Sequence, residues 1–344
     1  MTRTLGLVFL WILSIGAIHL SLTPATLYAQ SPSPTQKERP TPSEKVIIDT
    51  DIGDDIDDAF ALALALKCPE LNILQINSGF GLVLIRTAML QRFLDEVGRA
   101  DIPVATGVPS PMPESHFTQR RYGERDGLRR PAPDAIESTL SLIRKYPNEI
   151  TLIAVGPMYN LAAMIDRDKD TFKKLKRVVI MGGSFYKRNG DFGFGKPQGP
   201  VAEWNIEQAV PEAQKLLAAN VPLYMIPSDS TQLKFDEVNR QILFKLDTPL
   251  TDQLLILYQL WGRSTPLLHD AMTIAFIVKP DMCPVTEMHV TIDNEGFTRM
   301  GPGKPNTYVC LESDPEHFIN FFMNRMLSNE EVRIDPKAQR NESQ

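Results

Sequence analysis

The chain has 344 residues, of which 43% are hydrophobic and 23% are charged, and this composition is typical of a folded globular protein. Its 42 Asp and Glu residues outnumber its 36 Lys and Arg residues, so the formal net charge is −6. Because a general nucleic-acid-binding protein needs a basic surface, this acidic balance excludes nucleic acid as the expected partner.

The first 43 residues have the composition of a targeting segment and a spacer. Arg3 precedes an apolar run over residues 5–22, which predicts a signal peptide over residues 1–29, with cleavage after Ala29. The alternative is an uncleaved N-terminal anchor, because the run approaches the length of about 18 to 20 residues that spans a bilayer. Residues 30–43 are rich in Pro and Ser and predict a spacer. We therefore expect a secreted or periplasmic protein, without stable membrane insertion once the signal is cleaved.

Strand-like and helix-like segments alternate from residue 44 onward. The strand-like runs are 45–49, 71–77, 149–155, 177–181 and 221–226, and the helix-like segments are 57–67, 83–97, 160–165 and 211–219. The strand runs are continuously apolar, which indicates burial on both faces of a sheet. The pattern predicts one α/β domain over residues 44–330, with an open, mostly parallel sheet and helices on both faces, followed by a polar tail over residues 331–344.

Four other regions carry weaker signals. Residues 109–133 are rich in Pro and Arg and predict a long functional loop outside the core. Residues 247–268 are expected to be mostly helical, residues 287–311 to form a strand pair with a turn at 294–296, and residues 315–327 to form a closing helix. Three cysteines exclude a multi-disulfide framework. Cys283 and Cys310 are the more plausible pair for a single disulfide, and the sequence leaves that pairing open.

The first predicted strand is followed by an unusual concentration of negative charge. Six Asp residues lie within positions 49–58, at a strand end where open α/β sheets bind ligands. Helix capping accounts for one or two of these carboxylates, but six like charges repel one another unless a cation compensates them. Oxygen ligands without a nearby Cys or His suit Ca²⁺ or Mg²⁺ and argue against zinc.

Later element ends carry further polar or glycine-rich segments. They are residues 155–160 (VGPMYN), 181–184 (MGGS), 202–205 (AEWN) and 269–270 (HD). Glycines allow the backbone to approach a ligand closely, and Glu203 and Asn205 flank an aromatic residue that suits stacking against a ring. Asp270 taken alone is equally well explained as a helix cap.

In order and spacing, these segments resemble the calcium-dependent nucleoside hydrolases, the inosine-uridine preferring family, over residues 46–280. The resemblance implies one bound Ca²⁺ held by three carboxylates and one backbone carbonyl, those of Asp51, Asp58, Asp270 and Val155. It implies contacts with the ribose hydroxyls from Asp57, Glu203 and Asn205. Asp51 would also take a proton from a calcium-bound water, and His269 would stand near the leaving base, where its pKa range suits proton donation.

The reaction implied by this resemblance is hydrolysis of the N-glycosidic bond of a ribonucleoside to free base and ribose. Such a bond breaks through an oxocarbenium-like sugar, which needs negative charge nearby and a positioned water. The expected partner is therefore a small-molecule nucleoside or another N-riboside. Homo-oligomers are common in the family, and nothing in the sequence fixes the oligomeric state or the base preference, for which Phe117, Tyr122 and Trp204 are candidate ring contacts.

The sequence departs from the family pattern in several places. Asp54, Asp55 and Ile56 separate Gly53 from Asp57, where the family has a single residue, so the loop at the metal is expected to differ. Residues 79–82 (GFGL) lack the Asn or Asp that follows Gly in the family, which predicts the loss of a sugar or metal-shell contact. Where many members carry a His, the nearest match is Tyr122.

Two other functions compete with this interpretation. A haloacid-dehalogenase-like phosphatase would use Asp49 as nucleophile and Asp51 as acid, but Gly53 stands where that family has Thr or Val, and no later acidic metal pair is found. A secreted protein that binds ribosyl compounds without turnover would keep the same scaffold, because a fold does not guarantee an activity. Release of free base would distinguish turnover from binding.

Overall fold

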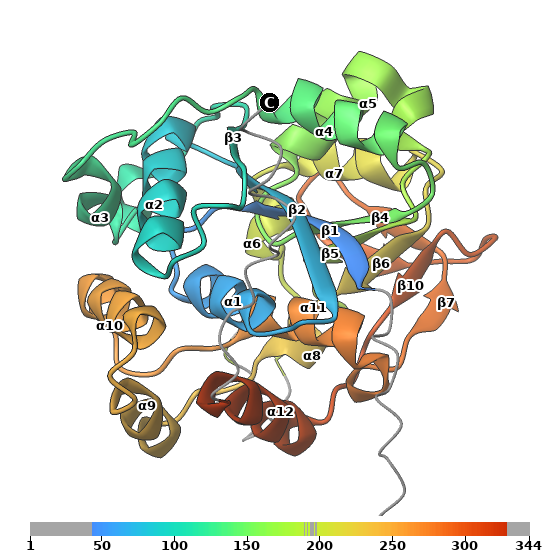
Figure 1. The fold of residues 1–344 in the computed structure, drawn as a ribbon. Helices are drawn as coiled ribbons and strands as arrows, with labels where there is room; N and C mark the ends of the chain where they lie inside the picture. The colour runs from blue at the N-terminus through green and yellow to red at the C-terminus, as the bar shows by residue number, and fades with distance from the viewer. Residues whose placement is uncertain (1–42, 189, 191, 193–195, 197, 329–344) are drawn as a thin grey trace, which may run out of the picture. The chain divides into compact units, whose positions relative to one another are not determined.

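The structure, a computed structural model, describes residues 43–188, 190, 192, 196 and 198–328 (Figure 1). The expected signal peptide over residues 1–29, the spacer up to residue 42 and the tail over residues 331–344 lie outside the described residues. Within the described part of the chain, no helix has both the length and the apolar character needed to cross a membrane.

A central sheet of eight strands organises the domain. Its spatial order is β3 (Val104–Thr106), β2 (Leu71–Ser78), β1 (Glu44–Thr50), β4 (Ile150–Ala154), β5 (Arg177–Met181), β6 (Leu223–Ile226), β10 (Thr307–Val309) and β7 (Thr286–Met288). Every neighbouring pair is parallel except β10 with β7, which is antiparallel. The predicted mostly parallel sheet is confirmed.

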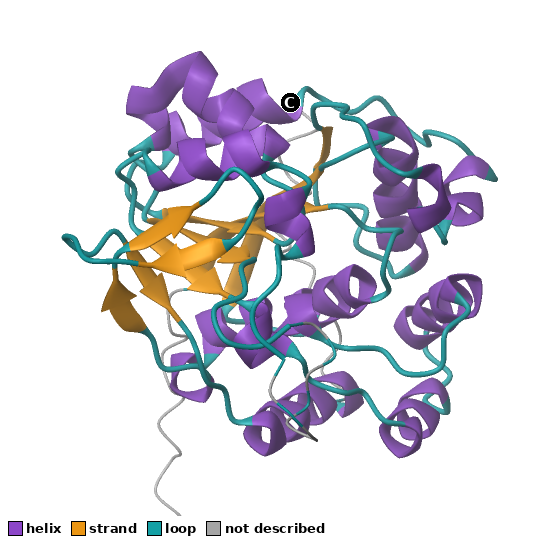
Figure 2. Ribbon diagram, turned by 180° about the vertical axis from the view of Figure 1, so that it is seen from behind, coloured by secondary structure: helices purple, strands orange, loops and turns teal. Residues whose placement is uncertain are grey.

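Helices cover both faces of this sheet, as predicted (Figure 2). Five pack on one face: α1 (Asp57–Leu66), α2 (Val83–Glu96), α10 (Pro249–Trp261), α11 (His269–Val278) and α12 (Pro315–Leu327). Three pack on the other: α4 (Ala135–Lys145), α5 (Tyr159–Phe172) and α7 (Val210–Leu217). The two cores separate because strand side chains alternate in direction, so Ile48 joins the first core and Ile47 the second.

Shorter elements complete the domain. They are the 3₁₀ turns η1 (Glu114–His116) and η2 (Pro280–Met282), the helices α3 (Arg120–Glu124), α6 (Trp204–Glu207), α8 (Ser228–Thr231) and α9 (Glu237–Phe244), and the strands β8 (Val290–Ile292) and β9 (Thr298–Met300). The expected strand pair near the C-terminus is the β8–β9 hairpin, while β7 and β10 join the main sheet. Cys283 and Cys310 form a disulfide that links the end of η2 to the end of β10.

Most of residues 109–133 lie outside the core, as predicted, but the prediction is wrong for Phe117 and Tyr122. Phe117 and Tyr122 are buried in the first core, and the Tyr122 hydroxyl donates to Gln253 Oε1 on α10 at 2.6 Å. Phe117 fills the space above Gly53, where a Cβ atom would lie 2.3 Å from its ring. Gly53 also has a φ of +118°, a conformation that favours glycine. The proline-rich segment therefore packs against the acidic loop that follows β1.

The strand order reverses beside β1. The chain runs from β1 outward through β2 to β3, and then returns to place β4 on the opposite side of β1. A reversal of this kind opens a crevice at the carboxyl ends of the two strands, and ligands of open α/β folds bind there. The acidic loop after β1 and the turn after β4 meet at this point.

Candidate active site

A cavity of about 420 Å³ opens at the carboxyl ends of the strands. It is lined by all eight residues that the sequence predicted for the site, namely Asp51, Asp57, Asp58, Val155, Glu203, Asn205, His269 and Asp270. These residues come from the ends of β1 and β4 and from the starts of α1, α6 and α11. The site is therefore assembled from segments that are more than 200 residues apart in the sequence.

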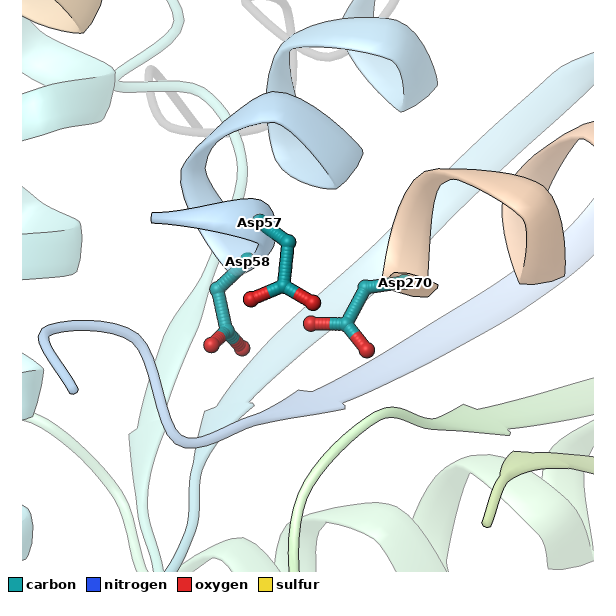
Figure 3. Close-up of side chains that lie close together, drawn as sticks. All are labelled: Asp57, Asp58 and Asp270. Carbon is teal, nitrogen blue, oxygen red and sulfur yellow. The ribbon is translucent and has the colours of Figure 1, made fainter. Parts of the chain in front are cut away.

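Three carboxylates meet where α1 and α11 begin. Oxygen atoms of Asp57, Asp58 and Asp270 all lie within 4.8 Å of one another, and Figure 3 shows the three side chains converging from the two helix starts. All three side chains are buried. A set of oxygen ligands with this spacing suits a hard divalent cation.

The electrostatics of this carboxylate group favour a bound cation. Burial raises the pKa of Asp57, Asp58 and Asp270 well above the usual range of a carboxyl, and the mutual repulsion of their charges raises it further. The Thr50 hydroxyl donates to Asp58 and compensates only part of this cost. A divalent cation would replace the water that these carboxylates lose on burial.

Asp51 lies in the same cavity but outside the three-carboxylate group of the described residues. Its side chain packs against the turn after β4, where a Cβ on Gly156 would lie 2.5 Å from Asp51 Oδ1. Burial, and then the charge of Asp58, raise the pKa of Asp51 well above its usual value. Asp57, which the resemblance placed at the ribose, therefore lies with Asp58 and Asp270. Asp51, which the resemblance placed among the metal ligands, lies outside this group.

Arg86 was missed by the sequence analysis, and it is a fully buried cation in contact with the acidic loop. From α2 its guanidinium donates to the carbonyls of Asp51, Ile52 (2.9 Å) and Phe80 (2.8 Å) and to the carboxylate of Asp54 (2.9 Å). Its charge lowers the pKa values of Asp51, Asp54 and Asp58 against the upward effect of burial. In the sequence, a single Arg within a helical pattern gives no indication of this role.

Glu203 and Asn205 form hydrogen bonds with the backbone at the ends of β4 and β5. The Glu203 carboxylate accepts from the backbone N–H groups of Gly183 (3.0 Å), Asn205 (3.0 Å) and Ile206 (3.3 Å), and its burial raises its pKa to about 7. Asn205 Nδ2 donates to the carbonyls of Val155 (3.0 Å) and Met181 (3.2 Å). Because both amide hydrogens are used, Asn205 Oδ1 remains as the acceptor of this side chain.

His269 is the first residue of α11 and is largely buried at the cavity wall. Its Nδ1 lies 2.8 Å from the hydroxyl oxygen of Thr231. Burial lowers the pKa of His269 to about 4, so its neutral form predominates at pH 7.

The aromatic lining of the cavity differs from the prediction. Trp204 lines it, but Phe117 and Tyr122 are buried behind it and do not. His116 of η1 lines it instead, with its ring centroid 4.6 Å from that of Trp204. The proline-rich segment thus contributes the imidazole of His116 to the cavity. The sequence had given Tyr122, six residues later, as the nearest match to the histidine of the family.

The structure bears on two further sequence-based hypotheses. Asp49, the nucleophile of the phosphatase alternative, does not line the cavity, and its Oδ2 accepts from Asn160 Nδ2 (2.9 Å) and Asn77 Nδ2 (3.3 Å). Asp49 is therefore not placed to act as a nucleophile in this cavity. None of residues 79–82 lines the cavity either, and Phe80 is fully buried against the ring of Tyr159. The loss of a sugar or metal-shell contact from that loop stays a prediction.

Comparison with known proteins places this geometry in a family. Residues 46–320 match the inosine-uridine preferring nucleoside hydrolases. A pyrimidine-specific ribonucleoside hydrolase, RihA, of Klebsiella pneumoniae subsp. pneumoniae is 30% identical over 313 residues, covering 82% of this chain and 97% of that protein.

Solved structures agree with that assignment at the level of the fold. A plant nucleoside hydrolase, PpNRh1, is 24% identical with a TM-score of 0.72, and covers 83% of this chain and all of its own. A purine-preferring ribonucleoside hydrolase from Gardnerella vaginalis is 22% identical with a TM-score of 0.70, over 82% of this chain and 98% of its own. The resemblance noted in the sequence is confirmed, and the chain belongs to the inosine-uridine preferring nucleoside hydrolase family of N-glycosidases.

Proposed function

We propose that this protein hydrolyses the N-glycosidic bond of ribonucleosides to free base and ribose with one bound Ca²⁺. The observation that carries the proposal is the buried oxygen group of Asp57, Asp58 and Asp270 on the wall of a cavity that also holds Asp51. Ca²⁺ is favoured over softer metals because no Cys or His belongs to this group. When bound, the ion would supply positive charge that orients a water and the ribose hydroxyls.

The side chains of the cavity provide the remaining chemistry. Asp51 accepts the proton of the attacking water, since it lines the cavity and lies close enough to Asp58 for that charge to raise its pKa. Glu203 and the free Oδ1 of Asn205 accept hydrogen bonds from ribose hydroxyls. The surrounding negative charge stabilises the oxocarbenium-like sugar that forms as the bond breaks.

Base recognition is assigned to the ring pair of His116 and Trp204. Both rings line the cavity and lie next to each other, although they come from segments that are separate in sequence. Together they form one aromatic wall. An aromatic wall accepts the flat face of a purine or a pyrimidine without specifying either. We therefore leave the base to be ranked by experiment.

We also propose that the protein is exported to an oxidising compartment. The apolar run and spacer of residues 1–43 support it, and so does the disulfide between Cys283 and Cys310, because disulfides persist outside the reducing cytosol.

The test is reducing-sugar release from a panel of purine and pyrimidine ribonucleosides by the chain without residues 1–29. The assay is run in Ca²⁺, after chelation, and after Ca²⁺ is restored, with Mg²⁺ addition as the matched control for the metal. Release that disappears with the chelator and returns with Ca²⁺ supports the proposal. Tight nucleoside binding in calorimetry without any release would instead identify a binding protein.

A further inference from the structure

The short helix α8 forms part of the cavity wall. Ser228 at its start lines the cavity of the candidate active site, while Asp229 and Ser230 line a second cavity of about 330 Å³. At its end, Thr231 Oγ1 lies 2.8 Å from Nδ1 of His269. Because empty space beside a side chain removes van der Waals contacts, packing constrains α8 less than it constrains a core helix, and the hydrogen bonds of α8 matter more.

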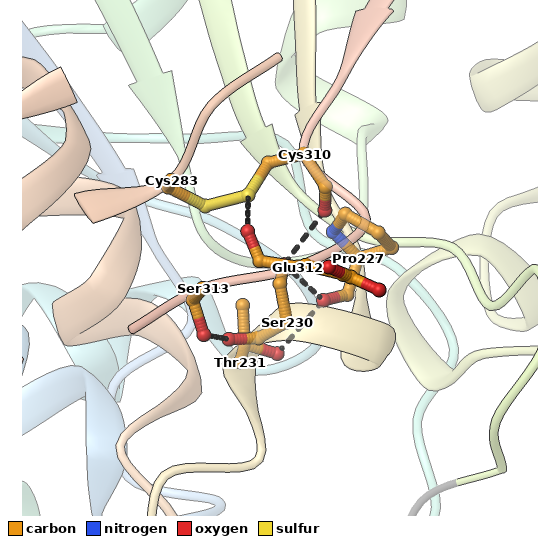
Figure 4. The surroundings of a disulfide bond; sticks show 7 residues. All are labelled: Pro227, Ser230, Thr231, Cys283, Cys310, Glu312 and Ser313. Atoms are coloured by element: carbon orange, nitrogen blue, oxygen red, sulfur yellow. Dashed lines mark hydrogen bonds between the residues drawn. A yellow bond between two sulfur atoms is a disulfide. The ribbon is translucent and has the colours of Figure 1, made fainter. Parts of the chain in front are cut away.

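Two hydroxyl groups join α8 to the segment that follows β10. The Ser230 hydroxyl donates to Cys310 O at 2.8 Å, which is nearer than Pro227 O at 3.2 Å. The Ser313 hydroxyl donates to Ser230 O at 2.6 Å, and Figure 4 shows both bonds. Ser230 is buried, so water does not readily replace these partners. We call the bonds that Ser230 forms with Cys310 and Ser313 the α8 brace.

The disulfide between Cys283 and Cys310 extends this connection to α11. Cys283 directly follows η2, and η2 lies just beyond the C-terminal end of α11. Both cysteines are fully buried. The Asp314 N–H also donates to Met282 O at 3.0 Å, so the segment after β10 is tied to η2 by one covalent bond and one hydrogen bond. The α8 brace is therefore anchored to the far end of α11.

These contacts close a ring that includes α11. His269 begins α11, and from there the ring follows the helix to Cys283 and crosses the disulfide to Cys310. It continues through Ser230 into α8 and returns through Thr231 to His269. Helix α11 has ten residues and is about 15 Å long, so the disulfide acts on the cavity from a distance. Within this ring, α8 and the start of α11 separate only when one of its hydrogen bonds breaks.

We propose that Ser230 is a positioning residue through which the Cys283–Cys310 disulfide holds α8 and the start of α11 at the cavity. Ser230 does not line that cavity, but its helix carries Ser228, and the start of α11 carries Asp270 of the three-carboxylate group. Loss of the α8 brace therefore displaces parts of the cavity wall while the sheet stays intact. The effect on turnover rests on the proposed function, whereas the position of α8 is a property of the protein alone.

Amide hydrogen exchange, followed by mass spectrometry of peptides, tests the position of α8 without any substrate. The double variant Ser230→Ala/Ser313→Ala removes both bonds of the brace and keeps the disulfide. We expect residues 228–233 to exchange at least about tenfold faster in this variant, and residues 150–154 of β4 to exchange at the parental rate. Thr273→Val is the matched control, because the Thr273 hydroxyl is buried on α11 without a hydrogen-bond partner among the described residues. Parental exchange of residues 228–233 in the double variant would overturn the proposal, whether or not any nucleoside is cleaved.

Turnover is then measured on the ribonucleoside that the parent protein cleaves fastest, at a temperature where circular dichroism shows every variant to be folded. Ser230→Ala/Ser313→Ala should lower kcat/KM by about three- to tenfold. Ser230→Thr keeps the hydroxyl, and the second cavity has room for its methyl group, so it should retain the parental value. Parental kcat/KM in the double variant would contradict the positioning role. If the parent cleaves no ribonucleoside, the proposed function fails, and hydrogen exchange still decides the position of α8.

A cycle of variants tests whether the disulfide acts through the brace. Cys283→Ala/Cys310→Ala should lower kcat/KM of the parent but have little further effect in Ser230→Ala/Ser313→Ala, because both changes open the same ring. Equal factors in the two backgrounds would show that the disulfide acts independently, and would overturn the assigned route. If the variant without the disulfide does not fold, the serine variants decide the proposal, because they keep the disulfide.

Discussion

The guanidinium of Arg86 lies 2.9 Å from the carboxylate of Asp54, and the Arg86 side chain is fully buried. Asp54 belongs to the stretch that makes the acidic loop longer than the family pattern, so the extra carboxylate has an internal partner. The same guanidinium also donates to three carbonyls of the surrounding loops. Arg86 therefore holds the loop in shape with a fixed positive charge.

Removing this cation should be costly. Arg86→Met leaves Asp54 buried without its partner and three carbonyls without a donor, so we expect the free energy of unfolding to fall by about 3 to 5 kcal/mol. Asp54→Asn keeps an oxygen that accepts from Arg86 and should cost only about 1 to 2 kcal/mol. Urea denaturation measures both. Leu84→Ala, at an exposed position of the same helix, is the control, and equal losses for Arg86→Met and Leu84→Ala would contradict the assigned role.

Calcium should stabilise the folded protein through the three-carboxylate group. At a concentration about 100 times its Kd, a ligand that binds only the folded state adds about 2.7 kcal/mol. Asp58→Asn and Asp270→Asn should lose most of this gain in thermal unfolding, because each removes one of three charged ligands. Asp55→Asn is the control, since Asp55 lines the cavity outside that group. An unchanged calcium shift in both ligand variants would place the ion elsewhere.

Asp49 should make stability depend on pH. Burial raises its pKa from 3.8 in the unfolded chain to about 7, so folding favours its protonated form. The corresponding stability is fully present below about pH 4, declines as the pH rises toward 7, and is absent above that value. Asp49→Asn, which can still accept from Asn160 and Asn77, should remove this decline.

The measurement is the urea midpoint of parent and Asp49→Asn proteins between pH 5 and pH 8, in saturating Ca²⁺. Glu203, whose pKa is also raised to about 7, is common to both proteins, so the difference between their profiles isolates Asp49. Two parallel profiles would show that Asp49 does not change its protonation over this range.

Asp51→Asn should separate catalysis from metal binding. The amide keeps the size of the side chain but cannot take a proton from water, so we expect kcat to fall by about 10² to 10⁴. Because Asp51 lies outside the three-carboxylate group, calcium affinity in calorimetry should change much less than in Asp58→Asn. Parental turnover in Asp51→Asn would exclude it as the base.

The sequence predicted the sheet because its signals are local, and it predicted the cavity residues because the order and spacing of their segments resemble those of the family. Strand β5 and helix α12 have the predicted boundaries, since each is a continuous or periodic apolar run between clear ends. The three-residue strand β3 and helix α4 were not predicted, because β3 is short and α4 follows a proline-rich stretch that hides its periodicity. A strand as short as β3 depends on its pairing with β2, and a local sequence pattern does not reveal that pairing.

The missing parts of the site depend on tertiary contacts. His116 lines the cavity, while Phe117 and Tyr122, which the sequence offered as candidate ring contacts, anchor the same segment in the core. Arg86 lies in an ordinary amphipathic helix, and its role follows from loops that come from two other segments. Such roles require the packed structure, while the Asp residues of positions 49–58 could be identified because they cluster in sequence.

Trp204 and His116 should control base binding more than bond cleavage. Their ring centroids are 4.6 Å apart at an interplanar angle of 57°, and both rings line the cavity. Trp204→Ala should raise KM by about three- to tenfold, the size of one aromatic contact, with a smaller change in kcat, because the same contact is made in the ground state and the transition state.

Trp204→Phe, which keeps an aromatic ring, serves as the matched control and should retain most of the affinity. A double-mutant cycle with His116→Ala then measures whether the two rings act together, because contacting residues give losses that do not add. If Trp204→Ala instead lowered kcat at constant KM, the ring would act on the transition state. Additive losses would mean that each ring binds a different part of the substrate, and the wall would then consist of two independent contacts.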